Sequence, residues 1–378
     1  MQFTLIGNPE NRRCQFFMAA AKSQGFAAPF VVSYLDLLRQ KVDLSHFLSK
    51  SDALRIDSPG ENMEVTRHFL QLGAEHPNLA NAARISAKAA GQLVFEKGRI
   101  QFMRQQHLGF LLCLEQIEQH LAQYPALKVM NSIEGIRLMF DKIACHQHFQ
   151  KQAISVVPAI YTVQNYDDLQ QKMAQRGWNR VFIKPIHGSS ASGVIAYRKK
   201  GVQEQAISSV ELVHNQQQTK LYNSLKIRTY HKTKDIAYLI NHLAKEGVIV
   251  EQWIPKASLP EGVFDLRMVV IGNKAQHTVV RQSQSPMTNL HLGNQRGNLD
   301  TVKAILGTDR WKSLCSLAEQ ALASLPNTLY AGLDVMLSNT LKKSYILEAN
   351  AFGDLLPNVL VKGKDTYSMA LSSMKEWQ

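Results

Sequence analysis

Residues 332–357 read GLDVMLSNTLKKSYILEANAFGDLLP and place two apolar segments around three oxygen-bearing side chains. Asp334 lies in the first segment, and Glu348 and Asn350 end the second. Side chains two positions apart on a strand share a face, so Glu348 and Asn350 should point the same way. If the two segments pair as antiparallel strands, Asp334 joins them. Two carboxylates and an amide oxygen suit Mg²⁺ or Mn²⁺, and carboxylates without partners in apolar strands would favour such a cation.

The stretch VFIKPIHGSSASGV at residues 181–194 supplies a lysine and a loop of small residues. Lys184 ends a short apolar strand, and the loop that follows contains Ser189 and Ser190. Backbone N–H groups of small residues can approach phosphate oxygens, and hydroxyls add further donors. The loop is not a P-loop, because the residues after its last glycine are Val-Ile, where that motif requires lysine and serine or threonine. Taken alone, a loop of this composition is more often an ordinary flexible turn.

A third stretch, VIVEQWIP at residues 248–255, has the composition of a buried strand that leads into a linker. The backbone from Gln252 to Ile254 can hydrogen-bond the edge of an adenine ring, and the Glu251 carboxylate can reach the exocyclic amine of the base. Further along, Arg267 in FDLRMVV and Arg281 in HTVVRQ accompany apolar strands. A charged side chain in such a place needs an anionic partner, so both arginines are expected to meet an anion.

In this order the pieces resemble the ATP-grasp superfamily, most of whose members are carboxylate–amine ligases. The resemblance spans about residues 131–357 and is to RimK-like ligases and D-alanine–D-alanine ligases. It implies that Lys184 and the loop after it cover the β- and γ-phosphates of ATP. The pair Asp141-Lys142, followed by SVVPAIYT, is similar to a helix of those ligases and implies that Lys142 is a second phosphate-binding lysine. Without the neighbouring pattern, Lys142 would be a solvated lysine on a helix surface.

The resemblance also implies roles for residues between the hinge and the metal motif. Asp265 corresponds to the acidic residue that binds ribose hydroxyls, and Arg281 to a residue that stabilises the γ-phosphate and an acyl phosphate. Arg267 belongs to the same acidic–apolar–arginine unit, and Asn289 is expected near the reacting end. The segment TNLHLGN at residues 288–294 is similar to SNLHRGG, but leucine replaces its arginine and asparagine its last glycine. The contact that this arginine makes in relatives is therefore expected to be missing.

Charge and length set limits on the partners. The 378 residues carry 43 Lys and Arg against 30 Asp and Glu, a formal net charge of +13. A positive field attracts anions, so nucleotides, acidic peptides and nucleic acid are all candidates. The basic residues are dispersed and match no nucleic-acid module, so a generally basic surface is favoured over an RNA site. The cysteines are scattered, no apolar run is long enough to span a membrane, and the start does not read as a signal peptide. These features predict a cytoplasmic protein without membrane contact.

The order of segments predicts an α/β fold with three parts. A strand–helix–strand start, FTLIG to PFVVSYLD, predicts a Rossmann-like parallel domain over residues 1–130, with a long helical region that continues to about Tyr124. The resemblance implies that a two-part ATP-grasp domain follows, with its phosphate-binding part in 131–250 and its metal-binding part in 251–378. The loop that begins at Gly353-Asp354 is expected to face the substrate.

The favoured hypothesis is an ATP-dependent, ADP-forming ligase that joins a carboxylate to an amine through an acyl phosphate. Its expected partners are small-molecule or peptide substrates of anionic character, and a homo-oligomer is left open. Two alternatives remain: a small-molecule kinase of the same fold, and a nucleotide-binding regulatory or RNA-associated protein without ligase turnover. Product analysis separates the three, because they give an amide, a phosphorylated product, or no substrate-stimulated turnover.

Overall fold

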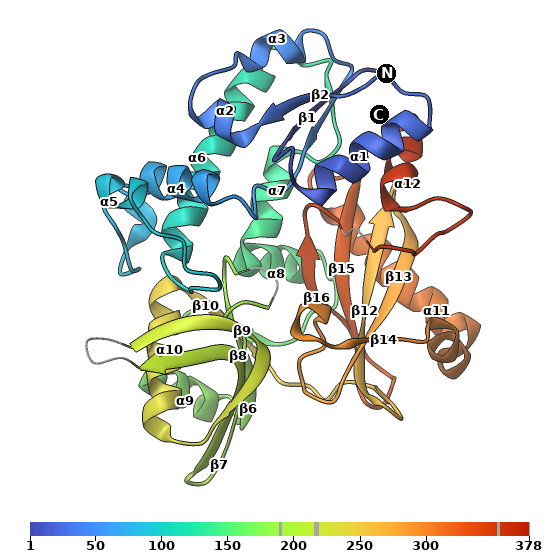
Figure 1. The fold of residues 1–378 in the computed structure, drawn as a ribbon. Helices are drawn as coiled ribbons and strands as arrows, with labels where there is room; N and C mark the ends of the chain where they lie inside the picture. Colours follow the sequence, from blue (N-terminus) through green and yellow to red (C-terminus); the bar gives the residue numbers. More distant parts are fainter. Residues whose placement is uncertain (189–190, 215–218, 354–355, 378) are drawn as a thin grey trace.

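A computed structural model describes residues 1–188, 191–214, 219–353 and 356–377 of the chain, which form three β-sheets with helices packed around them (Figure 1). The predicted phosphate contacts Ser189 and Ser190, and Asp354 of the predicted substrate loop, lie outside the described residues. Among the helices of the described ranges, none has the length and apolar character needed to cross a membrane.

The first sheet is parallel and has the strand order β2-β1-β3-β4. Every residue of β1 is buried, Thr4 included, as expected for a parallel strand covered on both faces. The parallel α/β start expected from the sequence is therefore confirmed. The elements that build this part are β1 (Phe3–Gly7), α1 (Arg12–Ser23), β2 (Phe30–Ser33), α2 (Tyr34–Leu38), α3 (Leu44–Leu48), β3 (Ala53–Ile56) and β4 (Lys128–Val129).

The helical region between β3 and β4 is more broken than the sequence predicts. It consists of α4 (Met63–Leu72), the 3₁₀ turn η1 (Pro77–Leu79), α5 (Ala87–Gly91) and α6 (Met103–Leu121). Helices α4 and α6 pack so closely that a Cβ atom on Gly109 would lie 1.8 Å from the Phe69 carbonyl oxygen. Between α5 and α6 the chain is irregular, and Ile100 lies in the core of the central sheet. This contact explains why the predicted helical region is interrupted.

The central sheet has the strand order β5-β10-β6-β7-β8-β9. Helix α10 covers it with the apolar stripe Ile236, Leu239, Ile240 and Leu243, spaced as one face of a helix requires. The elements are α7 (Ile133–Phe140), α8 (Lys142–Lys151), β5 (Ala159–Ile160), α9 (Tyr166–Gln175), β6 (Arg180–Pro185), β7 (Ile195–Lys200), β8 (Gln203–His214), β9 (Thr219–Tyr230), α10 (Thr233–Glu246) and β10 (Val248–Gln252).

The third sheet is antiparallel, with the order β14-β13-β12-β15-β16 and β11 paired to β12. Strand β15 is buried along its whole length, because the long helix α11 packs against this sheet. The elements are β11 (Ser258–Leu259), β12 (Gly262–Ile271), β13 (Lys274–Ser283), the 3₁₀ turn η2 (Leu290–Leu292), β14 (Gln295–Gly297), α11 (Leu299–Ser324), β15 (Tyr330–Leu337), β16 (Ser344–Asn350) and α12 (Thr366–Met374).

A buried arginine joins the first sheet to the C-terminal part of the chain, where α12 lies beside α1 (Figure 1). The Arg55 guanidinium bonds Asp57, with Nη2 and Oδ2 3.1 Å apart. Its Cζ atom also lies 4.9–5.0 Å from the ring centroids of Phe17, Tyr330 and Tyr367. A cation stacked on three rings and paired with a carboxylate needs no water, so it can hold the two parts together in the core.

Candidate active site

The charged side chains of the third sheet lie opposite one another across four neighbouring strands. Asp265 of β12 is the register partner of Arg281 of β13, and Arg267 of β12 is the partner of Asp334 of β15. Asp334 in turn lies opposite Glu348 of β16, in the antiparallel pairing that the sequence predicts. Cross-strand partners lie close together on one face of a sheet, so residues distant in the sequence form one charged row.

The carboxylates of this row have protein partners, contrary to the expectation that they would stand unpaired. Asp334 Oδ1 lies 2.6 Å from Arg267 Nε, and Asp334 Oδ2 lies 3.0 Å from Arg281 Nη2. Glu348 Oε1 lies 2.9 Å from Lys142 Nζ. Nothing in the sequences of β15 and β16 shows that β12, β13 and α8 bring cations to them. Support for a cation site here therefore comes from the kind of oxygen atoms present, and not from unpaired charge.

Asp265 is fully engaged within the protein. Its Oδ1 atom accepts from Arg281 Nε at 2.8 Å, and its Oδ2 atom accepts from Lys256 Nζ at 2.9 Å and from the Thr288 hydroxyl. Burial raises its pKa, but Arg281 and Lys256 outweigh burial and hold the pKa well below the usual range. With both oxygens occupied, the carboxylate is placed to hold Arg281 rather than to meet a ribose, which argues against the predicted ribose contact.

Lys256 is a member of the site that the sequence did not reveal. It follows the hinge strand β10, and its ammonium donates to Asp265 and, at 2.8 Å, to the Thr288 hydroxyl. Burial lowers its pKa, and the neighbouring cations Arg281 and Lys184 add to this effect against the attraction of Asp265. An isolated lysine in a linker carries no signal by itself. Only the pairing of the linker with the strand that carries Asp265 could have drawn attention to Lys256.

The two predicted phosphate lysines lie at the junction of the central and third sheets. Lys142 begins α8 and donates to the Gly188 carbonyl at 2.6 Å, in addition to its pair with Glu348. Lys184 Nζ lies 2.7 Å from Glu251 Oε2. Burial opposes the charge of Lys184, yet its pKa is raised, because Glu251 and the more distant carboxylates Glu348 and Asp334 attract the ammonium. Both lysines are therefore held in a shared field of carboxylates.

The described part of the phosphate loop is hydrogen-bonded at its first end and closely packed at its last. Ile186 accepts from the backbone N–H of Lys142 at 3.4 Å and donates to the Gly247 carbonyl at 3.1 Å. Gly193 has a φ of 76°, and a Cβ atom there would lie 2.7 Å from the Pro185 ring. A side chain at this position would therefore meet both backbone strain and a clash, which accounts for a glycine at the end of the loop.

The hinge differs in detail from the prediction. The backbone N–H groups of Gln252, Trp253 and Ile254 all donate within the protein, to Pro158, Arg180 and Gln252 carbonyls at 2.9, 3.2 and 3.0 Å. Donors for an adenine edge are thus already used in this conformation. The Glu251 carboxylate, by contrast, faces a cavity.

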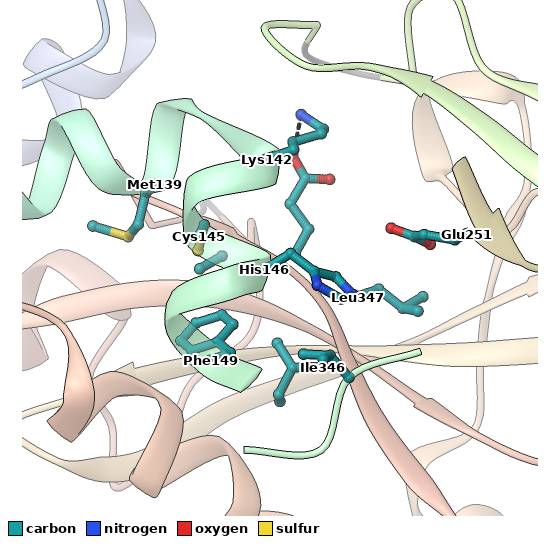
Figure 2. Close-up of a pocket in the computed structure, with 11 residues that line it drawn as sticks. Met139, Lys142, Cys145, His146, Phe149, Glu251, Ile346 and Leu347 are labelled. Atoms are coloured by element: carbon teal, nitrogen blue, oxygen red, sulfur yellow. Dashed lines mark ion pairs between the residues drawn. The ribbon is translucent and has the colours of Figure 1, made fainter. Parts of the chain in front are cut away.

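This cavity is small, about 20 Å³, and lies between α8, β10 and β16 (Figure 2). Figure 2 shows Lys142 and Glu251 toward one side, and Phe149 and Ile346 toward the other. Its lining is polar where Lys142, Glu251 and Glu348 meet, and mostly apolar elsewhere, with Met139, Cys145, His146, Phe149, Val156, Ile346, Leu347 and Ala349. In this conformation the cavity has room for about one water molecule. Cys145 and His146 were not among the predicted site residues.

The donor set fits a hard divalent cation. Asp334 and Glu348 supply carboxylates, and Asn350 donates through its Nδ2 to the Gly332 carbonyl at 2.9 Å, which leaves its carbonyl oxygen as the acceptor end. Within the described ranges, no group of three or more His, Cys, Asp and Glu is arranged to hold a metal ion. A site here would rest on two carboxylates and an amide, with phosphate oxygens completing the shell.

Asn289 has a local structural role in the loop after β13. Its side chain accepts from the backbone N–H of His291 at 2.9 Å and so caps η2. The Asn294 side chain, which stands where relatives are expected to have glycine, donates to the carbonyls of Met287 and Asn289 at 2.7 and 2.9 Å. The departure from the expected motif thus stabilises the loop, and the predicted place of Asn289 at the reacting end stays a prediction.

Comparison with known protein families gives one match. Residues 135–354, which contain both lysines and the whole charged row, match the YheC/D-like ATP-grasp family. The chain belongs to this family. The matched segment covers more than half of the protein, and the predicted ATP-grasp superfamily of carboxylate–amine ligases and the predicted fold class are confirmed. Among curated proteins, none matches the sequence.

Solved structures agree with this assignment. The protein is similar to D-cycloserine synthetase DcsG, with a TM-score of 0.57, 13% identity, and 100% and 99% of the two chains covered. It is also similar to the ATP-grasp ligase PsnB complexed with a precursor variant, Mg and ADP. The TM-score is 0.54, the identity 14%, and 100% and 97% of the two chains are covered. A third similar structure is the D-alanine–D-alanine ligase of Bacillus anthracis complexed with ATP. The TM-score is 0.54, the identity 10%, and 100% and 96% of the two chains are covered. At these identities the likeness shows the shared fold.

Proposed function

We propose that this ATP-grasp protein is an ADP-forming ligase that joins a carboxylate to an amine through an acyl phosphate. The observation that carries the proposal is the set of three ion-paired contacts, Lys142–Glu348, Lys184–Glu251 and Arg281–Asp334. Cations suited to phosphate are paired with carboxylates, two of which suit a metal ion. When Mg-ATP binds, the phosphates replace the carboxylates as partners of the cations, so little charge is left uncompensated.

The proposed chemistry needs positioning rather than a covalent intermediate on the protein. Lys142, Lys184 and Arg281 attract the triphosphate, and Arg281 is oriented by Asp265. A substrate carboxylate attacks the γ-phosphorus, ADP leaves, and an amine then displaces phosphate from the acyl phosphate. Groups fixed in place before the reaction stabilise the developing charge without reorganising. Arg267 holds Asp334 and completes this row of charge.

Asp334, Glu348 and Asn350 are the residues that would hold Mg²⁺ or Mn²⁺ in this proposal. Bound there, the cation would neutralise charge on the β- and γ-phosphates. The base would lie beside Glu251, and the walls of the small cavity there would have to move apart to admit it. The acid and amine are small molecules or peptides, classes represented by the D-cycloserine synthetase and precursor-bound ligase among the similar structures. Cytoplasmic location remains part of this proposal.

The reaction class predicts the products and the path of one oxygen atom. With cation charge gathered at the end of the triphosphate, cleavage should occur there and give ADP and phosphate. When the substrate carboxylate carries ¹⁸O, one labelled oxygen should appear in the released phosphate, as mass spectrometry of the phosphate would show. Appearance of AMP, or phosphate without the label, would contradict an acyl phosphate. A stable phosphorylated substrate would indicate a kinase, and no substrate-stimulated turnover would indicate a nucleotide-binding protein.

Replacing Lys184 with methionine is expected to weaken Mg-ATP binding about tenfold or more. The change keeps the apolar stem but removes a charge-assisted phosphate contact, typically worth about 1.5–3 kcal/mol. Titration calorimetry measures the affinity. Glu251, whose side chain is 5% exposed, would lose its partner in this variant.

The double variant Lys184→Met/Glu251→Gln removes that unpaired charge and so tests for an indirect effect on folding. Lys151→Met, an exposed lysine on α8, is the matched control and should bind as the native protein does. Native affinity in a folded Lys184→Met protein would exclude Lys184 from the phosphate site.

A further inference from the structure

Two histidines from distant parts of the chain stack beside the phosphate loop. His107 lies on α6, and His187 follows β6 at the start of the loop. Their ring centroids are 3.6 Å apart and their planes differ by 9°. His187 Nδ1 lies 3.3 Å from the Phe140 carbonyl oxygen. Because a carbonyl can only accept, Nδ1 carries the hydrogen, and Nε2 of His187 holds the lone pair.

The pair adjoins one of the two phosphate lysines. His187 directly precedes Gly188, whose carbonyl accepts from Lys142 Nζ at 2.6 Å. The residue before it, Ile186, accepts from the Lys142 backbone at 3.4 Å. A charge that arrives at Lys142 therefore acts on His187 across a short distance, and inside a protein such an effect is weakly screened.

The surroundings keep both rings neutral in the nucleotide-free protein. Burial lowers the pKa of His187 to about 4, helped by the cations Lys142 and Arg104. Burial likewise lowers the pKa of His107 to about 2, with His187, Arg104 and Lys142 acting in the same direction and Asp141 against them. From α10, Glu246 faces this region and accepts from the Arg104 backbone at 3.0 Å. The charges beside the pair are thus mainly positive.

We propose that the His107–His187 pair takes up one proton when the triphosphate of ATP binds. The inference rests on the proposed function, because it needs phosphates at Lys142 and the loop. Bound phosphates replace a positive field with a negative one, and the proton passes from solvent to Nε2 of His187. A second proton is disfavoured, since two positive rings at this spacing repel each other. The charged His187 then acts as a positioning residue that keeps Gly188 and Lys142 beside the phosphates, and His107 shields it from water.

Linkage fixes the sign of the pH dependence. A group with a higher pKa in the complex than in the free protein takes up protons on binding, so binding strengthens as pH falls. The gain in affinity applies at pH values between the pKa of His187 in the complex and its pKa of about 4 in the free protein. Within that window one proton corresponds to at most about tenfold in affinity per pH unit.

Calorimetric titration with Mg-ATP, without a carboxylate substrate, tests the proposal directly. Near pH 6 and pH 7 the binding enthalpy is measured in two buffers of different ionisation enthalpy, and the slope gives the protons taken up. The native slope is expected to exceed that of His187→Gln by about half to one proton. His107→Gln should reduce the uptake near pH 6, because a solvated His187 is already partly charged. His46→Gln, an exposed histidine of α3, is the control and should keep the native slope.

Equal slopes in the native protein and in His187→Gln, with nucleotide bound in both, would overturn the proposal and leave the proposed function intact. Native uptake in His107→Gln would also overturn it, since the pair would then not act as a unit. Absence of any Mg-ATP binding to the native protein would reject the proposed function together with this inference. If a variant does not fold, absence of proton uptake by the native protein when Mg-ATP binds would by itself overturn the proposal.

Discussion

Replacing Glu348 with glutamine is expected to lower turnover by at least about a hundredfold, the usual cost of losing one preorganised charge in a reacting site. The amide is nearly isosteric and can still accept from Lys142, which now lies 2.9 Å from the carboxylate. The fold should therefore persist. What is lost is a negative donor for the cation, so the rate should recover in part at high magnesium. Steady-state rates over a magnesium titration measure this.

Two further variants test whether the effect is specific to the cation site. Asn350→Ala should act in the same direction but more mildly, because it deletes a neutral donor. Glu134→Gln, at an exposed position in the first turn of α7, should leave turnover and its magnesium dependence unchanged. Native turnover in Glu348→Gln at ordinary magnesium concentration would remove this residue from the cation site.

Replacing Asp265 with asparagine is expected to destabilise the protein by about 3–5 kcal/mol, the cost of leaving buried cations without their carboxylate. Lys256 and Arg281 both lie within 2.9 Å of this side chain. Because the folded pKa of Asp265 is depressed, its contribution is present above the ordinary aspartate value of about 3.9 and declines as pH falls below it. The difference between variant and native protein should therefore shrink in acid. Denaturant midpoints across pH measure both effects.

Asp167→Asn, at an exposed position in the first turn of α9, is the matched control and should shift the midpoint only slightly. A midpoint for Asp265→Asn close to the native one at neutral pH would mean that Lys256 and Arg281 find other partners. The buried network would then not depend on this carboxylate.

The sequence predicts those parts of the site that lie on short, regular segments. Alternation along β16 places Glu348 and Asn350 together, and the apolar run before Lys184 marks a strand that ends at a loop. These inferences need only local periodicity. The family resemblance extends them, because it relates Lys142 to Lys184 across an intervening helix and strand. The strand–helix–strand start of the chain was predictable for the same local reason.

What the sequence could not predict depends on register between distant strands. Asp334 was expected to lack partners because nothing local shows that Arg267 and Arg281 lie opposite it. Lys256 reaches Asp265 only because β11 and β12 form a hairpin that turns the linker back. The stack of His107 on His187 joins residues 80 positions apart and leaves no periodic signal. Such contacts follow from packing, and one sequence does not contain the pairing information that would reveal them.

The placement of Ile100 affects how this protein can be divided. Residues 96–104 precede the expected boundary at residue 130, yet Ile100 is 2% exposed in the core of the central sheet, and its backbone N–H donates to Leu221 at 3.0 Å. The segment that matches the family begins at residue 135 and does not include this side chain. A fragment cut there would carry a hole in its apolar interior and an unsatisfied strand edge. The segment that matches the family and the segment that packs as one core therefore differ in this chain. Recombination between relatives should succeed only where residues 96–104 are exchanged together with the central sheet.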